Sequence, residues 1–450
     1  MKMRILLNKL FCVQQIETKT KNGHIESNIP KKKSADPELW RDILAYWILG
    51  LGTEFGYVVM ICAANDILHG FGHSSPTESY PTADDADSIR QNVCDTPSTG
   101  VLLIADIVPS MLMNISCPFL PLAKNIRMML VIALNVSSFL LIANTDAEYL
   151  AIMGVVCTSL ALGIGEVTLL SYSAQFNKKV ITAWSSGTGS AGIIGSLSWA
   201  GLIALGMSPR DVMRLMLIVP AIQAVTFWFL LRSPQKQVVK SGVRNVAIAT
   251  IATIESNNCR ADSVLPSLDV KPSGLKAKLK FVPKLAGFIA PLVIVFIFEY
   301  ICVSGLFEMI YVRDLPFGLK FDAESQYRWF LVTYQIGVFS SRSLGAFLKP
   351  RRTWWATIAQ FLNFGFFMYV TATVQASNPW IIFVFVFWLG VVGGLCFVHT
   401  FHRLIKELPA NQHKFSLGMI TIAESIGIAI GGSSAILIHN ILCGKLLVTN

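Results

Sequence analysis

The sequence predicts an all-α, polytopic membrane protein of about eleven transmembrane helices. The 450 residues are 53% hydrophobic and only 14% charged, with a mean hydropathy of +0.56. Soluble domains carry about a quarter charged residues. Apolar runs of the roughly 20 residues that cross a bilayer recur along almost the whole chain. The charged side chains gather between these runs, so no sizeable soluble domain is expected.

The expected spans alternate in their flanking charge. They cover residues 43–68, 100–122, 126–144, 149–175, 180–206, 212–231, 283–310, 326–347, 353–375, 379–402 and 415–443. With the N-terminus in the cytosol, 29 of the 37 Lys and Arg residues lie in cytosolic segments and six lie on the opposite side. This distribution obeys the positive-inside rule and places the C-terminus on the non-cytosolic side. The net charge of +10 then reflects orientation and contact with anionic lipid, and no nucleic-acid partner is expected.

The polar segments divide the chain into five regions. We expect a disordered cytosolic tail (1–40), a first helical bundle of spans 1–6 (41–231), a flexible basic cytosolic linker (232–282), a second bundle of spans 7–11 (283–443) and a short tail on the far side of the membrane (444–450). The two bundles share a sequence pattern, because each contains a basic connector followed by a Gly/Ser-rich helix. A pseudo-repeat of 6+5 helices resembles the major facilitator arrangement, whose substrate site lies between the halves.

A glycine motif offers a competing interpretation. The letters "GTGSAG" at 187–192 match G-x-G-x-x-G, the fingerprint of a dinucleotide-binding loop. That loop needs a preceding strand and a following helix, whereas these residues lie within an apolar segment. Small residues four apart instead allow two membrane helices to approach closely. We therefore expect Gly187, Gly189, Gly192 and Gly195 to serve helix packing, and no cofactor.

Ionisable residues inside the spans are the candidates for function, because a charge within the bilayer is costly and usually faces a cavity. Glu54, Glu166, Glu299 and Glu424 lie deep in their spans and are expected in a transport cavity, where they could exchange protons. Three other carboxylates lie nearer to span ends and are expected to be solvated or to cap helices: Asp66, Asp106 and Glu308.

Four further residues are candidates for binding substrate. Arg342 could pair with a carboxylate as a structural lock or bind an anionic group. Tyr57 and Tyr300 are core aromatics by default, but their rings could also face a cationic head group. His399 lies three residues before His402, and both could be interfacial instead of ligands.

The cysteines and the missing motifs narrow the functional classes. The nine cysteines show no metal-ligand spacing, so no metal is expected; Cys94 and Cys443 fall on the same non-cytosolic side and could form a disulfide. A secondary transporter fits the buried carboxylates in both halves. An enzyme is not expected, because the chain lacks a paired H-x-x-x-H, a nucleophile elbow or an acid-rich catalytic motif. The alternative is a non-transporting membrane scaffold that binds trafficking proteins through its tail and linker.

Six blocks carry a family resemblance. In order they are "YVVMICAANDIL", "LLIADIVP", "LGIGEVTLLSYSAQF", "WSSGTGSAGIIGSLS", "QYRWFLVTYQIGVFSSRS" and "HTFHRL". Over residues 40–443 the chain resembles the battenin family, although Glu54 stands where that family usually has an uncharged amide. The resemblance implies a major facilitator-related fold in late endosomal and lysosomal membranes, with a luminal C-terminus. It also implies roles in lysosomal pH, basic amino-acid homeostasis, autophagic and vesicular traffic, and export of small polar metabolites such as glycerophosphodiesters.

Overall fold

The computed structural model describes most of the expected spans and few of the segments between them. The described residues are 39–68, 98–117, 120, 122–173, 176, 179–232, 275–310, 323–345, 352–373, 378–408 and 410–449. All of them belong to the compact unit Glu38–Asn450. Residues 1–38 of the expected tail, most of the expected linker and nearly all residues between the expected spans 1 and 2 lie outside these ranges.

The first half consists of helices that follow the expected spans 1–6. They are α2 (Leu39–Cys62), α3 (Ala64–Leu68), α5 (Gly100–Ser116), α6 (Lys124–Asn144), α7 (Glu148–Ser173), α8 (Lys179–Ala204), α9 (Pro209–Leu215), α10 (Ile218–Val225) and the π-helix η2 (Thr226–Leu230). The turn between α8 and α9 contains Gly206, whose φ of 88° is readily reached by glycine alone. Ser208 then caps α9 by accepting a hydrogen bond from the backbone N–H of Asp211, with Pro209 in the first turn.

The second half follows spans 7–11. It contains α12 (Leu275–Ile301), the π-helix η3 (Cys302–Leu306), the 3₁₀ helix η4 (Phe307–Met309), α13 (Ala323–Gly345), α14 (Trp354–Thr373), α15 (Pro379–Glu407) and α16 (Ala410–Thr449). α12 begins inside the expected linker. α16 continues through the residues expected to form the short tail, up to Thr449. Both differences extend helices beyond the apolar runs that hydropathy detects.

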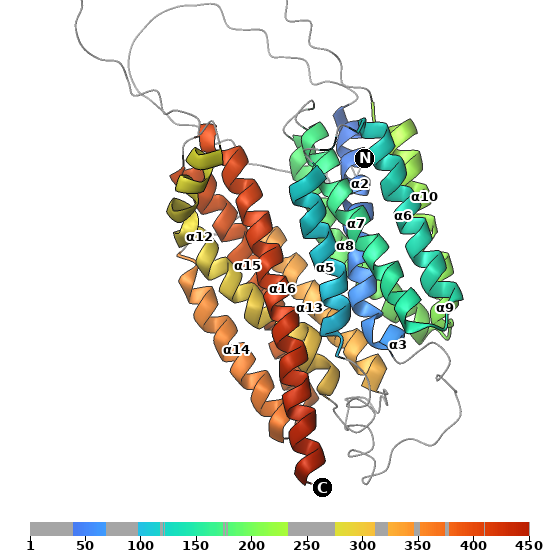
Figure 1. The fold of residues 1–450 in the computed structure, drawn as a ribbon, viewed down its shortest axis with the longest axis vertical. Helices are drawn as coiled ribbons and strands as arrows, with labels where there is room; N and C mark the ends of the chain where they lie inside the picture. The colour runs from blue at the N-terminus through green and yellow to red at the C-terminus, as the bar shows by residue number, and fades with distance from the viewer. Residues whose placement is uncertain are drawn as a thin grey trace, which may run out of the picture. The chain divides into compact units, whose positions relative to one another are not determined.

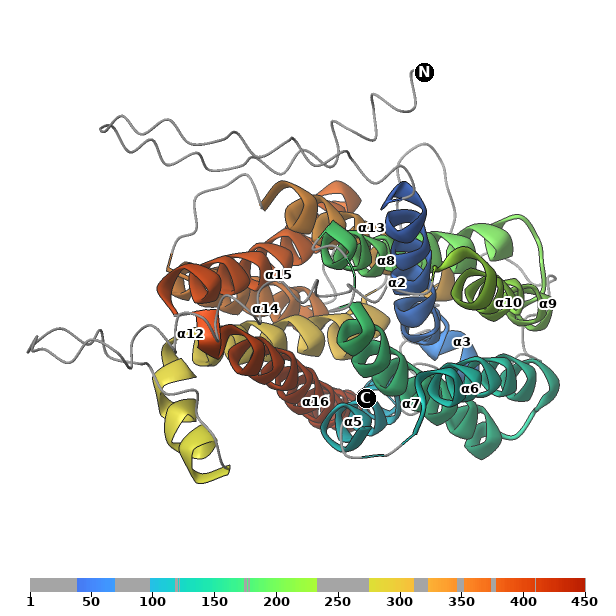
Figure 2. The ribbon, with the colours of Figure 1, turned by 90° about the horizontal axis from the view of Figure 1, so that it is seen from above.

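The two halves pack with the same internal pattern (Figures 1 and 2). In the first half α2 packs on α8 and α5 on α7; in the second half α12 packs on α16 and α13 on α15. These pairs are spans 1 and 5, 2 and 4, 7 and 11, and 8 and 10, so they correspond under a shift of six spans. Between the halves, α5 packs on α16 and α8 packs on α13. These contacts join spans 2 and 11 and spans 5 and 8, so a shift of six spans converts each contact into the other. The packing confirms the expected repeat of major facilitator type.

The end of the bundle at which α2 begins is called the near end, and the end at which α2 finishes is called the far end. Because the helices alternate in direction, α5, α7 and α13 run from the far end to the near end, whereas α8, α12 and α16 run from the near end to the far end. The largest core cluster contains residues of both halves, including the fully buried Trp199 and Phe330.

Length and composition identify fewer membrane-spanning helices than the eleven expected. Among the described residues, seven helical stretches are long and apolar enough to span a membrane. They are Leu39–Cys62, Lys124–Asn144, Glu148–Ser173, Pro209–Leu230, Pro283–Met309, Pro379–Leu404 and Gly418–Gly444. α5 is a shorter apolar helix, and α8, α13 and α14 run beside the others in the same bundle. The all-helical fold is confirmed, while the count of eleven spans stays a prediction.

The glycine motif lies wholly within α8, so its residues do not form a loop between a strand and a helix. Gly187 faces α2 so closely that a Cβ there would overlap the carbonyl oxygen of Trp47. Gly195 also faces α2, because a Cβ there would lie 3.1 Å from Cγ1 of Val58 on that helix. Gly192 faces α13 of the other half, where a Cβ would overlap Gln335 Oε1. Gly189 differs, because a Cβ there would meet just Phe339 at an ordinary 3.9 Å.

We predict that Gly187→Leu destabilises the protein by about 1–3 kcal/mol or more, because the side chain would force α2 and α8 apart. The matched control is Gly201→Leu in the same helix, where a Cβ meets nothing within 4 Å. Thermal unfolding of the purified protein in detergent measures the difference. Equal midpoints for the two variants would contradict close packing as the role of Gly187.

Candidate functional site

Five of the predicted ionisable residues meet at the interface between the halves. Glu54 of α2 and Glu166 of α7 come from the first half, and Arg342 of α13 and Glu424 of α16 come from the second. All four are partly exposed, and Glu54 interacts electrostatically with the other three. Glu299 of α12 interacts with both Arg342 and Glu424. We call these five residues the central cluster.

Glu299 is the most enclosed member of the central cluster, with 1% of its surface exposed. The hydroxyl of Tyr334 donates a hydrogen bond to its Oε1 at 2.8 Å, while Oε2 has no hydrogen-bond partner within the described part of the chain. Gly393 of α15 makes room for this carboxylate, since a Cβ there would overlap both of its oxygens. One carboxylate oxygen is therefore held by α13 and the other is left available.

Two tyrosines join the halves beside the central cluster. The hydroxyls of Tyr57 on α2 and Tyr300 on α12 lie 3.0 Å apart, and both side chains are buried. Either hydroxyl can donate this hydrogen bond. Tyr57 lies on the helix of Glu54, and Tyr300 directly follows Glu299 in the sequence. Their hydroxyls contact each other, which leaves their role in substrate binding a prediction.

Arg342 is held loosely. Its Nη2 lies 3.8 Å from Glu424 Oε1, which is too long for a strong hydrogen bond. Its guanidinium carbon lies 4.4 Å from the centre of the Phe397 ring, and its Nε has no hydrogen-bond partner among the residues described. About a third of the side chain is exposed, at 30%. Anion binding and a structural lock both stay predictions for Arg342.

The remaining candidates lie around this cluster. Asn114 of α5 donates from Nδ2 to Glu166 Oε2 at 3.0 Å, which orients the carboxylate. His399 is 3% exposed on α15, so it is not at a solvated interface. His402, one turn further along α15, is partly exposed. A role for His399 in binding substrate stays a prediction.

The expectation that Asp66, Asp106 and Glu308 are solvated is wrong, because all three are at least nine-tenths buried. Asp66 receives Trp199 Nε1 at 2.8 Å and Arg328 Nε at 2.9 Å, and Arg328 Nη2 pairs with its other oxygen. Since Arg328 belongs to α13 of the second half, this ion pair joins the halves at the far end.

Asp106 and Glu308 show two different ways to bury a carboxylate. Glu308 accepts the backbone N–H of Thr99 at 2.8 Å, at the first turn of α5, so its expected capping role is present across the two halves. Asp106 is 1% exposed, and neither of its carboxylate oxygens has a partner in the described ranges. Asp106 interacts electrostatically with Glu54. The sequence analysis named Asp106 but did not predict that its carboxylate is buried next to the central cluster.

The structure describes one of the two cysteines of the predicted disulfide. Cys443 takes part in a disulfide. Cys94 lies outside the described residues, so its pairing with Cys443 stays a prediction. Five other cysteines are free: Cys62, Cys117, Cys157, Cys302 and Cys396.

Comparison with known proteins decides the family. The model of the CLN3 protein family matches residues 44–445 of the chain. The chain belongs to the CLN3 family. Within that family, battenin from Canis lupus familiaris is 32% identical over 415 residues, which cover 90% of this chain and 92% of battenin. Protein BTN1 from Yarrowia lipolytica is 26% identical over 404 residues, covering 89% and 94% of the two chains.

Solved structures share the fold at low identity. A POT family transporter in complex with a thioalcohol-conjugated peptide superposes with a TM-score of 0.57 at 11% identity, covering 91% of this chain and 94% of the transporter. A bacterial homolog of the human lysosomal transporter Spinster, inward-facing and unoccupied, gives 0.55 at 11% identity over 89% and 82%. The chain thus shares the helical fold of these two transporters, in a multi-pass membrane protein.

We predict that Arg328→Gln costs about 3–5 kcal/mol of stability, because it leaves the Asp66 carboxylate buried without its counter-charge. The matched control is Arg210→Gln, because Arg210 pairs with Asp146 in an exposed position and such pairs contribute about 0–1 kcal/mol. Thermal unfolding compares both variants, and the double variant Arg328→Gln, Asp66→Asn should recover part of the loss. Equal effects of the two arginine substitutions would contradict a buried inter-half ion pair.

Proposed function

We propose that this chain is a transporter of late endosomal and lysosomal membranes that exports small polar metabolites to the cytosol. The observation that carries the proposal is the central cluster, in which both halves supply charged side chains at their shared interface. In a two-half transporter fold, this interface is where substrate binds, near the midplane. Family resemblance suggests glycerophosphodiesters as cargo.

The charges of the central cluster suit a cargo that carries both signs. Arg342 is partly exposed and only loosely paired, so its guanidinium can receive a phosphate or a carboxylate in a bidentate manner. The four glutamates can face a cationic head group, and Phe397 already stacks on one cation. A glycerophosphodiester with a choline head group would satisfy both requirements.

The same carboxylates could couple transport to protons. In an acidic lumen a buried carboxylate can take up a proton, and at cytosolic pH it can release it. Glu299 fits this role because Tyr334 holds one of its oxygens while the other is free. Glu166 of the first half fits the same role, because Asn114 holds one of its oxygens.

The proposal is tested by flux in proteoliposomes loaded with radiolabelled glycerophosphocholine. We expect the wild type to release the label faster than empty liposomes and Arg342→Ala to reduce release to background at every pH, because the phosphate loses its fixed cation. Arg342→Lys, which keeps the charge but loses the planar fork, should retain part of the rate. Arg210→Ala at the exposed pair with Asp146 serves as the control and should match the wild type. No flux by the correctly folded wild type, with any of several small polar metabolites, would favour the membrane scaffold instead.

A second prediction concerns proton coupling. We expect wild-type release to accelerate as the pH inside the liposomes falls from about 7 to about 5, because protons are then available to the cluster. Glu299→Gln cannot exchange a proton, so its release should lose this pH dependence while exchange of labelled for unlabelled cargo persists. Glu166→Gln is measured in parallel. Unchanged pH dependence in both variants would show that these carboxylates do not carry the coupling proton.

A further inference from the structure

Asp106 is an enclosed carboxyl that the proposed transport mechanism leaves without a role. It lies on α5, the helix of the first half that packs on α16 of the second, and it is 1% exposed. Among the described residues, neither of its carboxylate oxygens has a hydrogen-bond partner. No Lys, Arg or His of those residues forms an ion pair with it. The side chain is therefore buried without a counter-charge from the described helices.

The hydroxyl groups next to Asp106 are committed to the backbone. Ser159 of α7 donates its hydroxyl hydrogen to the carbonyl oxygen of Asp106 and accepts the backbone N–H of Ser110 at 2.9 Å. The Ser110 hydroxyl donates to the carbonyl oxygen of Ile107 at 2.8 Å. These bonds hold α5 against α7, and they leave neither serine with a hydrogen for the carboxyl group of Asp106.

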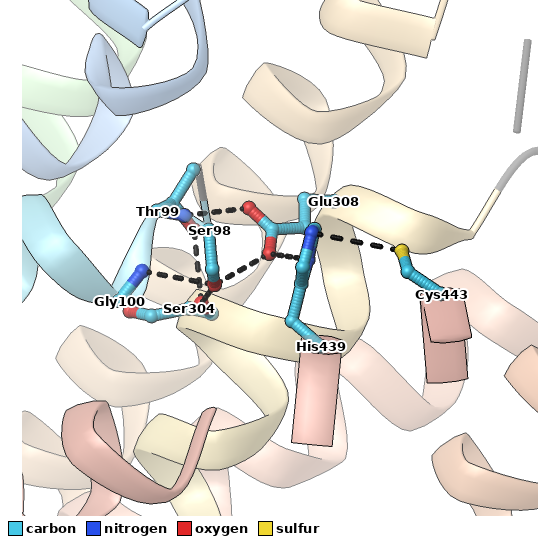
Figure 3. A network of polar contacts seen from close by, with 7 residues as sticks. All are labelled: Ser98, Thr99, Gly100, Ser304, Glu308, His439 and Cys443. Atoms are coloured by element: carbon cyan, nitrogen blue, oxygen red, sulfur yellow. Dashed lines mark hydrogen bonds and ion pairs between the residues drawn. The ribbon is translucent and has the colours of Figure 1, made fainter. Parts of the chain in front are cut away.

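Within the described helices, the ionisable groups around Asp106 are mostly acids. α5 packs on α2, α7, α16 and η3. The nearby ionisable side chains of these elements are Glu54 and Tyr57 of α2, Glu166 of α7, Glu424 and His439 of α16, and Cys302 of η3. Glu54 and Tyr57 interact electrostatically with Asp106. The basic group of this set, His439, has its Nδ1 2.9 Å from Glu308 Oε1 (Figure 3). Such surroundings disfavour a negative charge on Asp106.

The burial of Asp106 has a consequence for its charge, because an isolated carboxylate costs far more to bury than a neutral carboxyl. We propose that Asp106 binds a proton in this conformation, at a site separate from the central cluster, and releases it when the halves separate and water reaches the carboxyl. On release the O–H bond breaks, the proton passes to water, and the carboxylate becomes hydrated. This conformation holds one proton more than the hydrated one, so a rise in pH favours the hydrated conformation.

Two contacts between the halves lie next to this site. The Tyr57 hydroxyl lies 3.0 Å from that of Tyr300 on α12. α16 packs on α5 one turn before Asp106, where a Cβ on Gly432 would lie 3.1 Å from Leu103 Cδ2. Separation of the halves here would part both contacts and open a path for water to Asp106. The site rests on the proposed transporter function only for the use of its proton in coupling.

Infrared spectroscopy tests the charge of Asp106 directly, because the C=O stretch of a neutral carboxyl has a higher frequency than the stretches of a carboxylate. The sample is the full chain in lipid nanodiscs at about pH 7, where an aspartate in water, with a pKa of about 3.9, is ionised. We expect Asp106→Asn to remove one neutral-carboxyl band from the wild-type spectrum and to leave the carboxylate bands unchanged. The Asn amide is neutral and similar in shape, so the thermal unfolding midpoint should be at least that of the wild type.

The matched control is Asp146→Asn, the same chemical change at a side chain that is 82% exposed beside Arg210. This variant should lose carboxylate intensity and keep the neutral-carboxyl band. Both variants gain the same amide group, so a comparison between them cancels its contribution. Loss of carboxylate intensity in Asp106→Asn would overturn the proposal, and a bound Na⁺ that neutralises an ionised Asp106 would give that result.

Release of the proton is followed after transfer of the wild type into heavy water. Exchange of O–H for O–D lowers the frequency of the neutral-carboxyl band, so the rate of this change reports how often water reaches Asp106. Tyr57→Phe keeps the ring but loses the hydrogen bond to Tyr300, and we expect it to make the exchange faster. A band that never changes in heavy water would overturn the proposal, and an unchanged rate in Tyr57→Phe would overturn release by separation of the halves.

A second measurement covers failure of Asp106→Asn to fold. Wild-type protein is then made with aspartate that carries a heavy carbon isotope in its side-chain carboxyl, which lowers the frequency of aspartate bands and not of glutamate bands. Absence of an isotope-sensitive neutral-carboxyl band would overturn the proposal. None of these spectra needs cargo. A neutral, exchanging Asp106 without flux would reject the proposed transport alone, whereas flux with an ionised Asp106 would reject this proton site alone.

Discussion

A charge buried in a membrane bundle has to find its partner within the protein, because lipid supplies none. In this chain that constraint falls on the surface between the two halves. Asp66 of α3 pairs with Arg328 of α13, and Glu308 of η4 accepts from the start of α5. Each of these carboxylates is satisfied by groups from the opposite half. The interface is therefore held by specific polar partners in addition to apolar packing.

Close backbone contacts hold helices together within each half. Within the first half, Gly187 brings the backbones of α2 and α8 together; within the second, a Cβ on Gly337 of α13 would overlap the Phe387 carbonyl of α15. Such backbone contacts have no alternative arrangement of similar energy. Hydrogen bonds such as those of Glu308 can be exchanged for water when a gap opens. The helix pairs within each half are thus held by close backbone contacts, and Asp66 and Glu308 add polar contacts between the halves.

Hydropathy and charge predicted the helices well because both signals are local in sequence. Every expected span corresponds to a helix or a short run of helices, and Glu54 and Glu299 each interact electrostatically with Glu424, whereas their place in a transport cavity stays a prediction. The partners of buried charges could not be predicted, since Asp66 and Arg328 are 262 residues apart and no local pattern links them. Nor could sequence alone separate Gly189 from Gly192. Each residue turns a helix by about 100°, so only the positions of the neighbouring helices decide which glycine they touch.

The hydrogen bonds between the halves lie between the central cluster and the far end of the bundle. Tyr57 and Tyr300 meet beside the central cluster, and the bonds of Asp66 and Glu308 lie beyond them toward the far end. At the near end, Arg232 pairs with Asp42 of its own half. These contacts join the halves on the far side of the central cluster, in which Glu54, Glu166, Glu424 and Arg342 are partly exposed. For a cargo to reach Arg342 from the far end, the molecule would first have to break the polar contacts of Asp66 and Glu308 that join the halves there.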